Sequence, residues 1–216
     1  MGLFWGRKTD DTPATSATPS SVEREGTQVD YAPQGGLLNL QKNNILDLRK
    51  YSDSLNKVRV AAGWDIAKGR SSFDLDLCAF LLDANGRGIT KVYYGAKSST
   101  GIKLDGDNLT GEGEGDDENI NVTLEKIPAN VSSIVFSVVI FNASVKGQHF
   151  EDVENAFCRL VDESNGKEIC KFSLSEDGGK NTAVTFAELY RNDGGWSFRT
   201  IGTYSKDSID SLYRKY

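Results

Sequence analysis

The sequence contains one histidine and three cysteines among 216 residues, so it is poor in the side chains that build most zinc, redox and nucleophilic sites. The cysteines, Cys78, Cys158 and Cys170, are odd in number and show no CxxC spacing, which excludes a paired zinc or redox motif. Each lies in an apolar segment, and we interpret all three as buried thiols. His149 has no second histidine near it along the chain, so we expect a surface or helix-capping histidine.

The sequence also lacks long apolar runs and an excess of positive charge. No run reaches the roughly 18 apolar residues that a membrane-spanning helix requires. The first residues do not show the basic start and apolar segment of a secretory signal, so we expect a cytoplasmic protein. The chain has 25 basic and 31 acidic residues, a net charge of −6, which disfavours nucleic acid as a partner and favours cations.

Residues 9–35 are rich in Thr, Ser, Ala and Pro and poor in aliphatic residues, a composition typical of a disordered linker. The peptide MGLFWGRK, from Met1 to Lys8, precedes this linker and combines an apolar cluster with two bases. We interpret it as a docking peptide for another subunit, as a peripheral membrane anchor, or as an uncommitted disordered start. Gly6 stands where N-myristoylation requires Ser or Thr, so we expect no acylation. Residues 1–35 are therefore predicted to form a disordered tail.

From residue 36 onward the sequence changes to short segments rich in β-branched and aromatic residues, which predict strands. Asn-Gly and Asp-Gly pairs in the connecting segments favour tight hairpins. We predict an all-β fold, an antiparallel β-sandwich that forms one domain over residues 36–216, with short helices at 147–156 and 205–216. The predicted strands are 57–65, 73–82, 89–95, 120–127, 132–141, 156–162, 167–174, 183–191 and 196–204.

The segment DGDNLTGEGEGDDE, residues 105–118, concentrates seven acidic residues and four glycines without a single base. Left alone, its carboxylates would repel one another and its backbone would have little intrinsic order. A hard cation such as calcium takes six to eight oxygen ligands from carboxylates, amides, backbone carbonyls and water. The segment offers all of these, and a bound cation would offset the repulsion among Asp107, Asp116, Asp117 and Glu118, with Asn108 adding a neutral oxygen.

This segment matches neither of two familiar ion-binding loops. Aligned as an EF-hand from Asp105, it places Leu109 at an Asp or Asn position and Thr110 at the required glycine. It also contains no Lys, and its carboxylates would repel a phosphate. Magnesium stays an alternative to calcium, although it prefers fewer protein ligands and retains more water.

A second acidic cluster lies in FDLDLCAFLLD, residues 73–83. On a strand, Asp74 and Asp76 point to one face, whereas the apolar residues between and beside them point to the other. Two carboxylates on one face of an otherwise core-like strand repel unless an ion or hydrogen-bond donors meet them. Asp65, which closes GWD, is a weaker candidate of the same kind. The alternative interpretation is a set of solvated surface carboxylates.

Several motifs together resemble the TerD family of tellurium-resistance and general stress proteins. They are GWD, FDLDLCAFLL, GDNLTGEGEGDDE, GQHFEDVENAFCRLVD, LSED and FAELYRNDGGWSFRTIG, which occur in this order between residues 63 and 202. The resemblance covers about residues 36–216 and implies a β-sandwich that binds calcium through the acidic loop and nearby acids. It also implies a bacterial stress protein without an established catalytic activity.

Carried over residue by residue, the resemblance implies a metal site in the loop and on the strand before it. Its candidate residues are Asp74, Asp76, Asp107, Asn108, Thr110, Gly111, Gly113, Gly115, Asp116, Asp117 and Glu118. We expect two calcium ions as the cofactor. Cys78 stands where small residues such as Ser are common in the family, and residues 83–105 look reduced relative to many members. The second departure puts one side of the metal site in doubt.

We therefore expect a non-enzymatic calcium-binding protein of a bacterial chemical-stress response, in which the ion orders the loop for contact with other stress-system proteins. One alternative is an assembly or scaffold protein that docks through residues 1–8. Another is a metal-dependent hydrolase built on the clustered carboxylates. The sequence shows no nucleophile paired with a base, which argues against the hydrolase.

Overall fold

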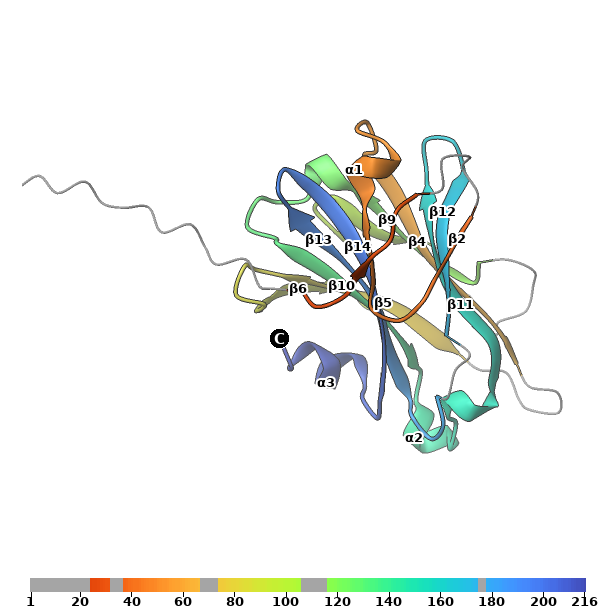
Figure 1. Ribbon diagram of the computed structural model, residues 1–216. Helices are drawn as coiled ribbons and strands as arrows, with labels where there is room; N and C mark the ends of the chain where they lie inside the picture. The colour runs from red at the N-terminus through yellow and green to blue at the C-terminus, as the bar shows by residue number, and fades with distance from the viewer. Residues whose placement is uncertain (1–23, 32–36, 67–73, 106–115, 175–177) are drawn as a thin grey trace, which may run out of the picture.

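The computed structural model describes residues 24–31, 37–66, 74–105, 116–174 and 178–216, and these form two β-sheets packed face to face (Figure 1). In spatial order, sheet A consists of β1 (Thr27–Gln28), β3 (Asn44–Asp47), β14 (Gly195–Ser205), β13 (Ala183–Asn192), β10 (Ser133–Ile140), β5 (Leu75–Leu82) and β6 (Gly88–Val92). Sheet B consists of β2 (Leu38–Leu40), β12 (Lys167–Ser173), β11 (Val153–Asp162), β4 (Lys57–Ile66), β9 (Glu118–Thr123), β8 (Ile102–Asp105) and β7 (Ser98–Ser99). The predicted all-β sandwich is confirmed.

All nine predicted strands correspond to observed ones, with ends that differ by a few residues. Most pairs are antiparallel, but β1 pairs with β3 and β2 pairs with β12 in parallel. Each sheet therefore has one parallel pair, at the edge formed by its most N-terminal strand. The predicted turns also form: Gly194, between β13 and β14, has a φ of 88°, which glycine adopts without a steric penalty.

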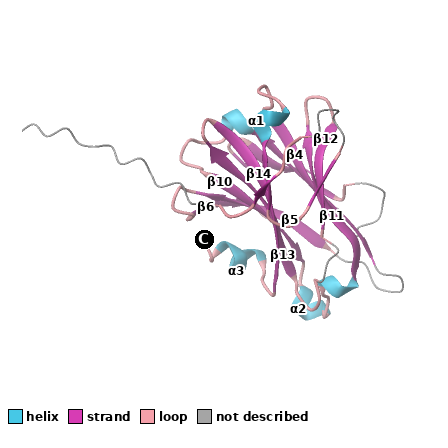
Figure 2. Cartoon of the chain, in the orientation of Figure 1, coloured by secondary structure: helices cyan, strands magenta, loops and turns pink. Residues whose placement is uncertain are grey.

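Helices are short and lie at the ends of the sandwich or against sheet A (Figure 2). They are α1 (Leu48–Tyr51), α2 (Ala143–Lys146) and α3 (Ile209–Tyr213), with 3₁₀ turns η1 (Leu124–Lys126) and η2 (Phe150–Asp152). The helix predicted at 147–156 is replaced by shorter elements, because Gly147 (φ 64°) ends α2 and His149 is extended before η2. The helix predicted at 205–216 contains α3.

Residues 24–31 belong to the segment predicted as a tail, and the structure places them against sheet A. Arg24 forms a 2.9 Å ion pair with buried Glu188 and lies 4.3 Å from the centre of the Tyr190 ring. The backbone amide of Thr27 donates to the carbonyl of Asn43, which continues the pairing of β1 with β3. Val29 and Tyr31 also pack against the main core, and because these contacts are made with distant parts of the chain, local composition does not predict them.

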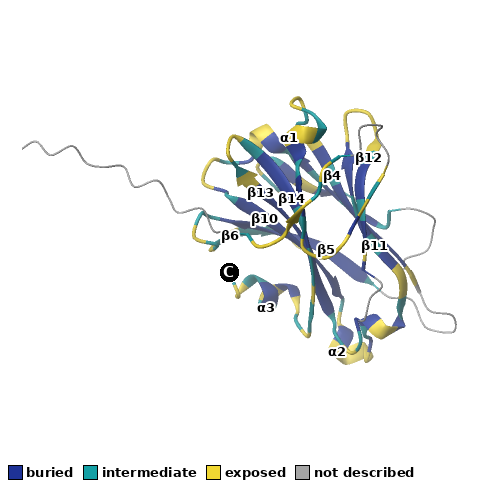
Figure 3. Cartoon of the chain, in the orientation of Figure 1, coloured by how far each residue is buried: buried dark blue, intermediate teal, exposed yellow. Residues whose placement is uncertain are grey.

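The main core fills the space between the sheets, and a second apolar cluster covers the outer face of sheet A (Figure 3). On β5, Leu75 and Leu77 point into the main core, whereas Cys78 and Phe80 belong to the outer cluster. Residues of α3 and the C-terminal Tyr216 cover this outer cluster. Both faces of β5 are thus buried, which explains its nearly continuous apolar sequence.

Candidate metal centre

The structure describes both ends of the acidic loop: Asp105, the last residue of β8, and the C-terminal root Asp116–Glu118, whose last residue begins β9. The other predicted loop ligands lie outside the described residues, and their assignment stays a prediction; they are Asp107, Asn108, Thr110, Gly111, Gly113 and Gly115. The root residues send their carboxylates to three different parts of the sandwich. The direction of Glu118 follows from the strand register of β9, which pairs it with Ala62.

Glu118 connects the two sheets. It pairs with Ala62 of sheet B, is only 2% exposed, and its carboxylate accepts a short hydrogen bond from the backbone amide of Leu77 in β5 of sheet A. β6 pairs with β5 only from Ala79 onward, so in the described part of the chain no strand pairs with this side of β5 at Leu77. The Glu118 carboxylate takes the place of a strand there, and the loop root is fixed to both sheets.

Asp117 anchors the root to β4. Its backbone amide donates to the carbonyl of Ala62 at 2.9 Å. Its carboxylate Oδ2 accepts the backbone amide of Trp64, also at 2.9 Å. Since these bonds involve backbone groups near the end of β4, the position of Asp117 is coupled to the position of that strand.

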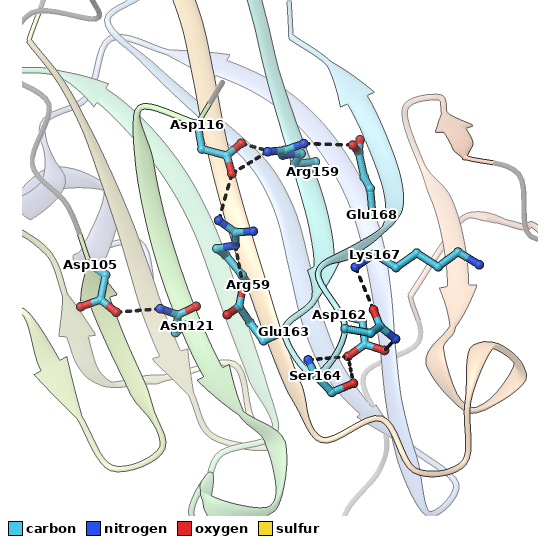
Figure 4. A network of polar contacts seen from close by, with 11 residues as sticks. Arg59, Asp105, Asp116, Asn121, Arg159, Asp162, Glu163, Ser164, Lys167 and Glu168 are labelled. Carbon is cyan, nitrogen blue, oxygen red and sulfur yellow. Dashed lines mark hydrogen bonds and ion pairs between the residues drawn. The ribbon is translucent and has the colours of Figure 1, made fainter. Parts of the chain in front are cut away.

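Asp116 lies over the outer face of sheet B between two arginines (Figure 4). Nε and Nη2 of Arg159 donate to its two oxygens at 2.6 and 2.8 Å, and Nη1 of Arg59 is 3.4 Å from Oδ2. The Asp116 side chain is only 5% exposed. The hydrogen bond with Asp116 is the largest cause that raises the pKa of Arg159, so the guanidinium is firmly protonated. Glu168 and Glu163 complete the network around Arg159 and Arg59 respectively.

The strand pair lies as the alternation predicts. Asp76 is buried on the face of β5 opposite Leu75 and Leu77, while Asp74 is half-buried just before the strand. Asp76 lines a cavity of about 600 Å³ at the α2 end of the sandwich, together with Tyr94 and other residues. Asp65 is exposed and accepts a 2.7 Å hydrogen bond from Nδ2 of Asn155.

The structure brings together one group that the sequence analysis did not predict. Ligand atoms of His149, Glu151 and Asp152 lie within 4.8 Å of one another around η2. His149 also lines the cavity that contains Asp76. His149 stands at the N-terminal boundary of η2, but its side chain forms no capping hydrogen bond there. The sequence predicts a helix over residues 147–156, but the 3₁₀ turn η2 is what places these three side chains together.

The donor chemistry of these residues fits a hard divalent cation. Carboxylate oxygens dominate the loop root and the strand pair, and such oxygens are the ligands that calcium prefers. By contrast, Cys78, Cys158 and Cys170 are all buried free thiols, as predicted, and burial raises the pKa of each. Soft-metal or thiolate chemistry therefore finds no support in these three residues.

The family model for the TerD domain matches residues 37–216 of this sequence. The chain belongs to the TerD family. The general stress protein 16U of Bacillus subtilis is 42% identical to it over 175 residues, which cover 77% of this chain and 90% of that protein. The tellurium resistance protein TerD of an Alcaligenes species is 40% identical over 185 residues, which cover 83% of this chain and 96% of that protein.

Solved structures agree with the TerD fold. A homologue of the telluride resistance protein TerD from Streptomyces coelicolor superposes with a TM-score of 0.61 at 24% identity, covering 74% of this chain and 96% of that chain. At this identity the likeness shows the fold alone. None of the helices in the described part of the chain has the length and apolar character that crossing a membrane requires.

Proposed function

We propose that this TerD protein is a non-enzymatic calcium-binding protein of a bacterial chemical-stress response of the tellurium-resistance type. Calcium binding orders the acidic loop, and the ordered loop contacts another protein of the stress system. Family membership and the names of its relatives support the stress role. The oxygen-rich donor set supports the choice of calcium over softer metals.

The observation that carries this proposal is the attachment of the loop root to both sheets. Glu118 accepts the amide of Leu77 in sheet A, and Asp117 accepts the amide of Trp64 in sheet B. A cation bound by the preceding residues therefore acts on a segment whose base is rigid. Such a base limits the conformational entropy that the loop loses on binding, since only the loop itself must become ordered.

The test is calorimetric titration of calcium into chelator-treated protein, with magnesium as competitor. We expect calcium-selective binding that weakens by at least about tenfold in the variant Asp107→Asn with Asp116→Asn, because each substitution removes a charged oxygen ligand. Asp117 and Glu118 are left intact, since their substitution would also break backbone contacts of the fold.

The matched control is Glu125→Gln. Glu125 is exposed in η1, which follows β9 at the end opposite the loop root, so this variant loses one charge without touching the site. Its calcium affinity should equal that of the wild type. Absence of calcium binding in the wild-type protein would contradict the proposal.

We also propose a cytoplasmic location and no catalytic activity. The burial of all three thiols argues against a cysteine nucleophile. An alternative is a scaffold that docks to a membrane or another subunit through residues 1–8. The ion pair of Arg24 with Glu188 attaches the first described residue of the N-terminal segment to sheet A. Removing residues 1–8 should then change oligomeric state or vesicle binding and leave calcium affinity unchanged.

A further inference from the structure

Arg59 and Arg159 form an unusual pair on the outer face of sheet B. Arg59 alternates with core residues of β4, and Arg159 lies between Cys158 and Leu160 of the main core on β11, so both guanidinium groups point away from sheet A. The strand register pairs Ala61 with Arg159 and Arg59 with Val161, so the two cations are neighbours. Like charges this close repel unless an anion lies between them. Asp116 is that anion (Figure 4).

Asp116 differs from the two residues that follow it. The carboxylates of Asp117 and Glu118 accept backbone amides of β4 and β5, so withdrawing them would leave strand positions without an acceptor. The hydrogen bonds of the Asp116 carboxylate to Arg159 and its ion pair with Arg59 involve side chains. These contacts can be exchanged for other charged partners without altering a sheet.

The arginines also have partners that remain if Asp116 leaves. Nε of Arg59 lies 2.6 Å from Glu163, and Nη1 of Arg159 lies 3.0 Å from Glu168. Each guanidinium would therefore keep one carboxylate and would not become an isolated charge. The two well-directed hydrogen bonds from Arg159 oppose the departure of Asp116, and the remaining carboxylates reduce its energetic cost.

We propose that Arg159, assisted by Arg59, sets the calcium affinity of the acidic loop by holding Asp116 over sheet B in competition with the ion. The inference rests on the proposed calcium function. Asp116 belongs to the acidic loop itself, so the same carboxylate serves either the arginines or the cation. If the Asp116 carboxylate is available to calcium for only part of the time, the apparent calcium affinity falls by that fraction. The ion pair thus acts as a built-in competitor that raises the calcium concentration needed for binding.

The test compares calcium titrations of the wild type, Arg159→Gln and Arg159→Lys. Lysine keeps the positive charge but loses the two-pronged hydrogen bond to Asp116. We expect Arg159→Gln to bind calcium about three- to tenfold more tightly, as for the loss of a partly buried ion pair, and Arg159→Lys to bind about twofold more tightly. Thermal unfolding of each variant establishes that it is folded before titration.

Arg199→Gln is the matched control. Arg199 forms a 2.9 Å ion pair with buried Glu188, and its side chain is 22% exposed against 27% for Arg159, but it lies on sheet A. We expect no change in calcium affinity for this variant. A second readout is the NMR signal of the Arg159 Nε–H group, which should shift on calcium addition while that of Arg199 stays fixed.

The outcomes separate the inference from the function on which it rests. Tighter binding in both Arg159 variants with a shift of the Arg159 signal supports the competition. Tighter binding in Arg159→Gln alone would reflect removal of a nearby positive charge and would overturn it. Unchanged or weaker binding in both variants would also overturn it and leave the calcium function standing. No binding by any of the proteins would remove the calcium function, and the inference with it.

Discussion

The outer faces of the two sheets each hold an acid between two arginines, Glu188 on sheet A and Asp116 on sheet B, but sheet A adds an apolar cluster. The outer face of sheet A is apolar around Cys78 and Phe80 and is covered by α3 and Tyr216. The outer face of sheet B carries the network of Arg59, Asp116 and Arg159 with its flanking glutamates. Apolar burial gives a face that stabilises the fold and resists rearrangement, whereas ion pairs are weaker and can exchange partners. The difference indicates that an apolar cover stabilises sheet A, whereas ion pairs fix Asp116 of the loop root on sheet B.

The largest expected effect comes from breaking the cover of sheet A. Phe80 is fully buried, and its ring lies 5.7 Å from the rings of Tyr213 and Tyr216. We expect Phe80→Ala to lower the free energy of unfolding by about 3–5 kcal/mol, measured by urea denaturation, because it leaves a cavity beneath α3. Calcium affinity should stay the same in the folded variant. A loss below about 1 kcal/mol would mean that the outer cluster contributes little.

The second prediction distinguishes the outer cluster from the main core through the cysteines. Cys78 lies beneath α3, whereas Cys158 and Cys170 lie between the sheets. Ending the chain after Ser208 removes the cover, so we expect Cys78 alone to react with a thiol reagent while circular dichroism still reports the sandwich. The milder variant Tyr213→Ala should also raise the rate at which Cys78 reacts with the reagent.

In the wild type, all three thiols should be protected, because burial raises their pKa and excludes the reagent. Mass spectrometry of the labelled peptides identifies which cysteine has reacted. Equal labelling of the three cysteines in a folded, truncated protein would contradict the separation of the two apolar clusters.

A smaller effect concerns the acid sensitivity of the α3 cover. Burial raises the pKa of Asp207, but hydrogen bonds from Lys215, Ser205 and Ser211 together outweigh it and hold the pKa below its ordinary value of 3.8. Because the folded-state pKa is the lower one, Asp207 stabilises the fold above about pH 3.8, and this contribution is lost as the pH falls through the folded-state value. We expect Asp207→Asn to lose less stability than the wild type between roughly pH 5 and pH 2.5. If the free energy of unfolding fell equally with pH in the two proteins, this role of Asp207 would be contradicted.

Sequence patterns predict the strands of this fold well because their causes are local. The alternation in FDLDLCAFLL places Leu75 and Leu77 in the core and Asp76 on the opposite face, as observed. The short strands β1, β2, β3, β7 and β8, by contrast, carry too few residues for a clear pattern and are not among the nine predicted strands. Their positions depend on neighbouring strands, which a periodicity within one segment does not encode.

The candidate site is only partly predictable for the same reason. The acidic loop stands out by composition, but the partners of Asp116 do not. Arg159 is 43 residues away in the sequence, and the register of β11 on β4 is what places it beside Arg59 and Asp116. The contact of Glu118 with Leu77 likewise depends on where β6 ends along β5. Long-range register determines which acids are held by the fold and which can exchange partners.

The most direct test of the central claim is hydrogen–deuterium exchange of the full chain with calcium and with chelator. If calcium orders the loop from its root, exchange should slow across residues 106–120 and at the start of β5, and should stay unchanged in α3 on sheet A. Loss of this protection with Asp107→Asn would assign it to the loop. Exchange that calcium leaves unaltered, or slows equally on both sheets, would contradict the account.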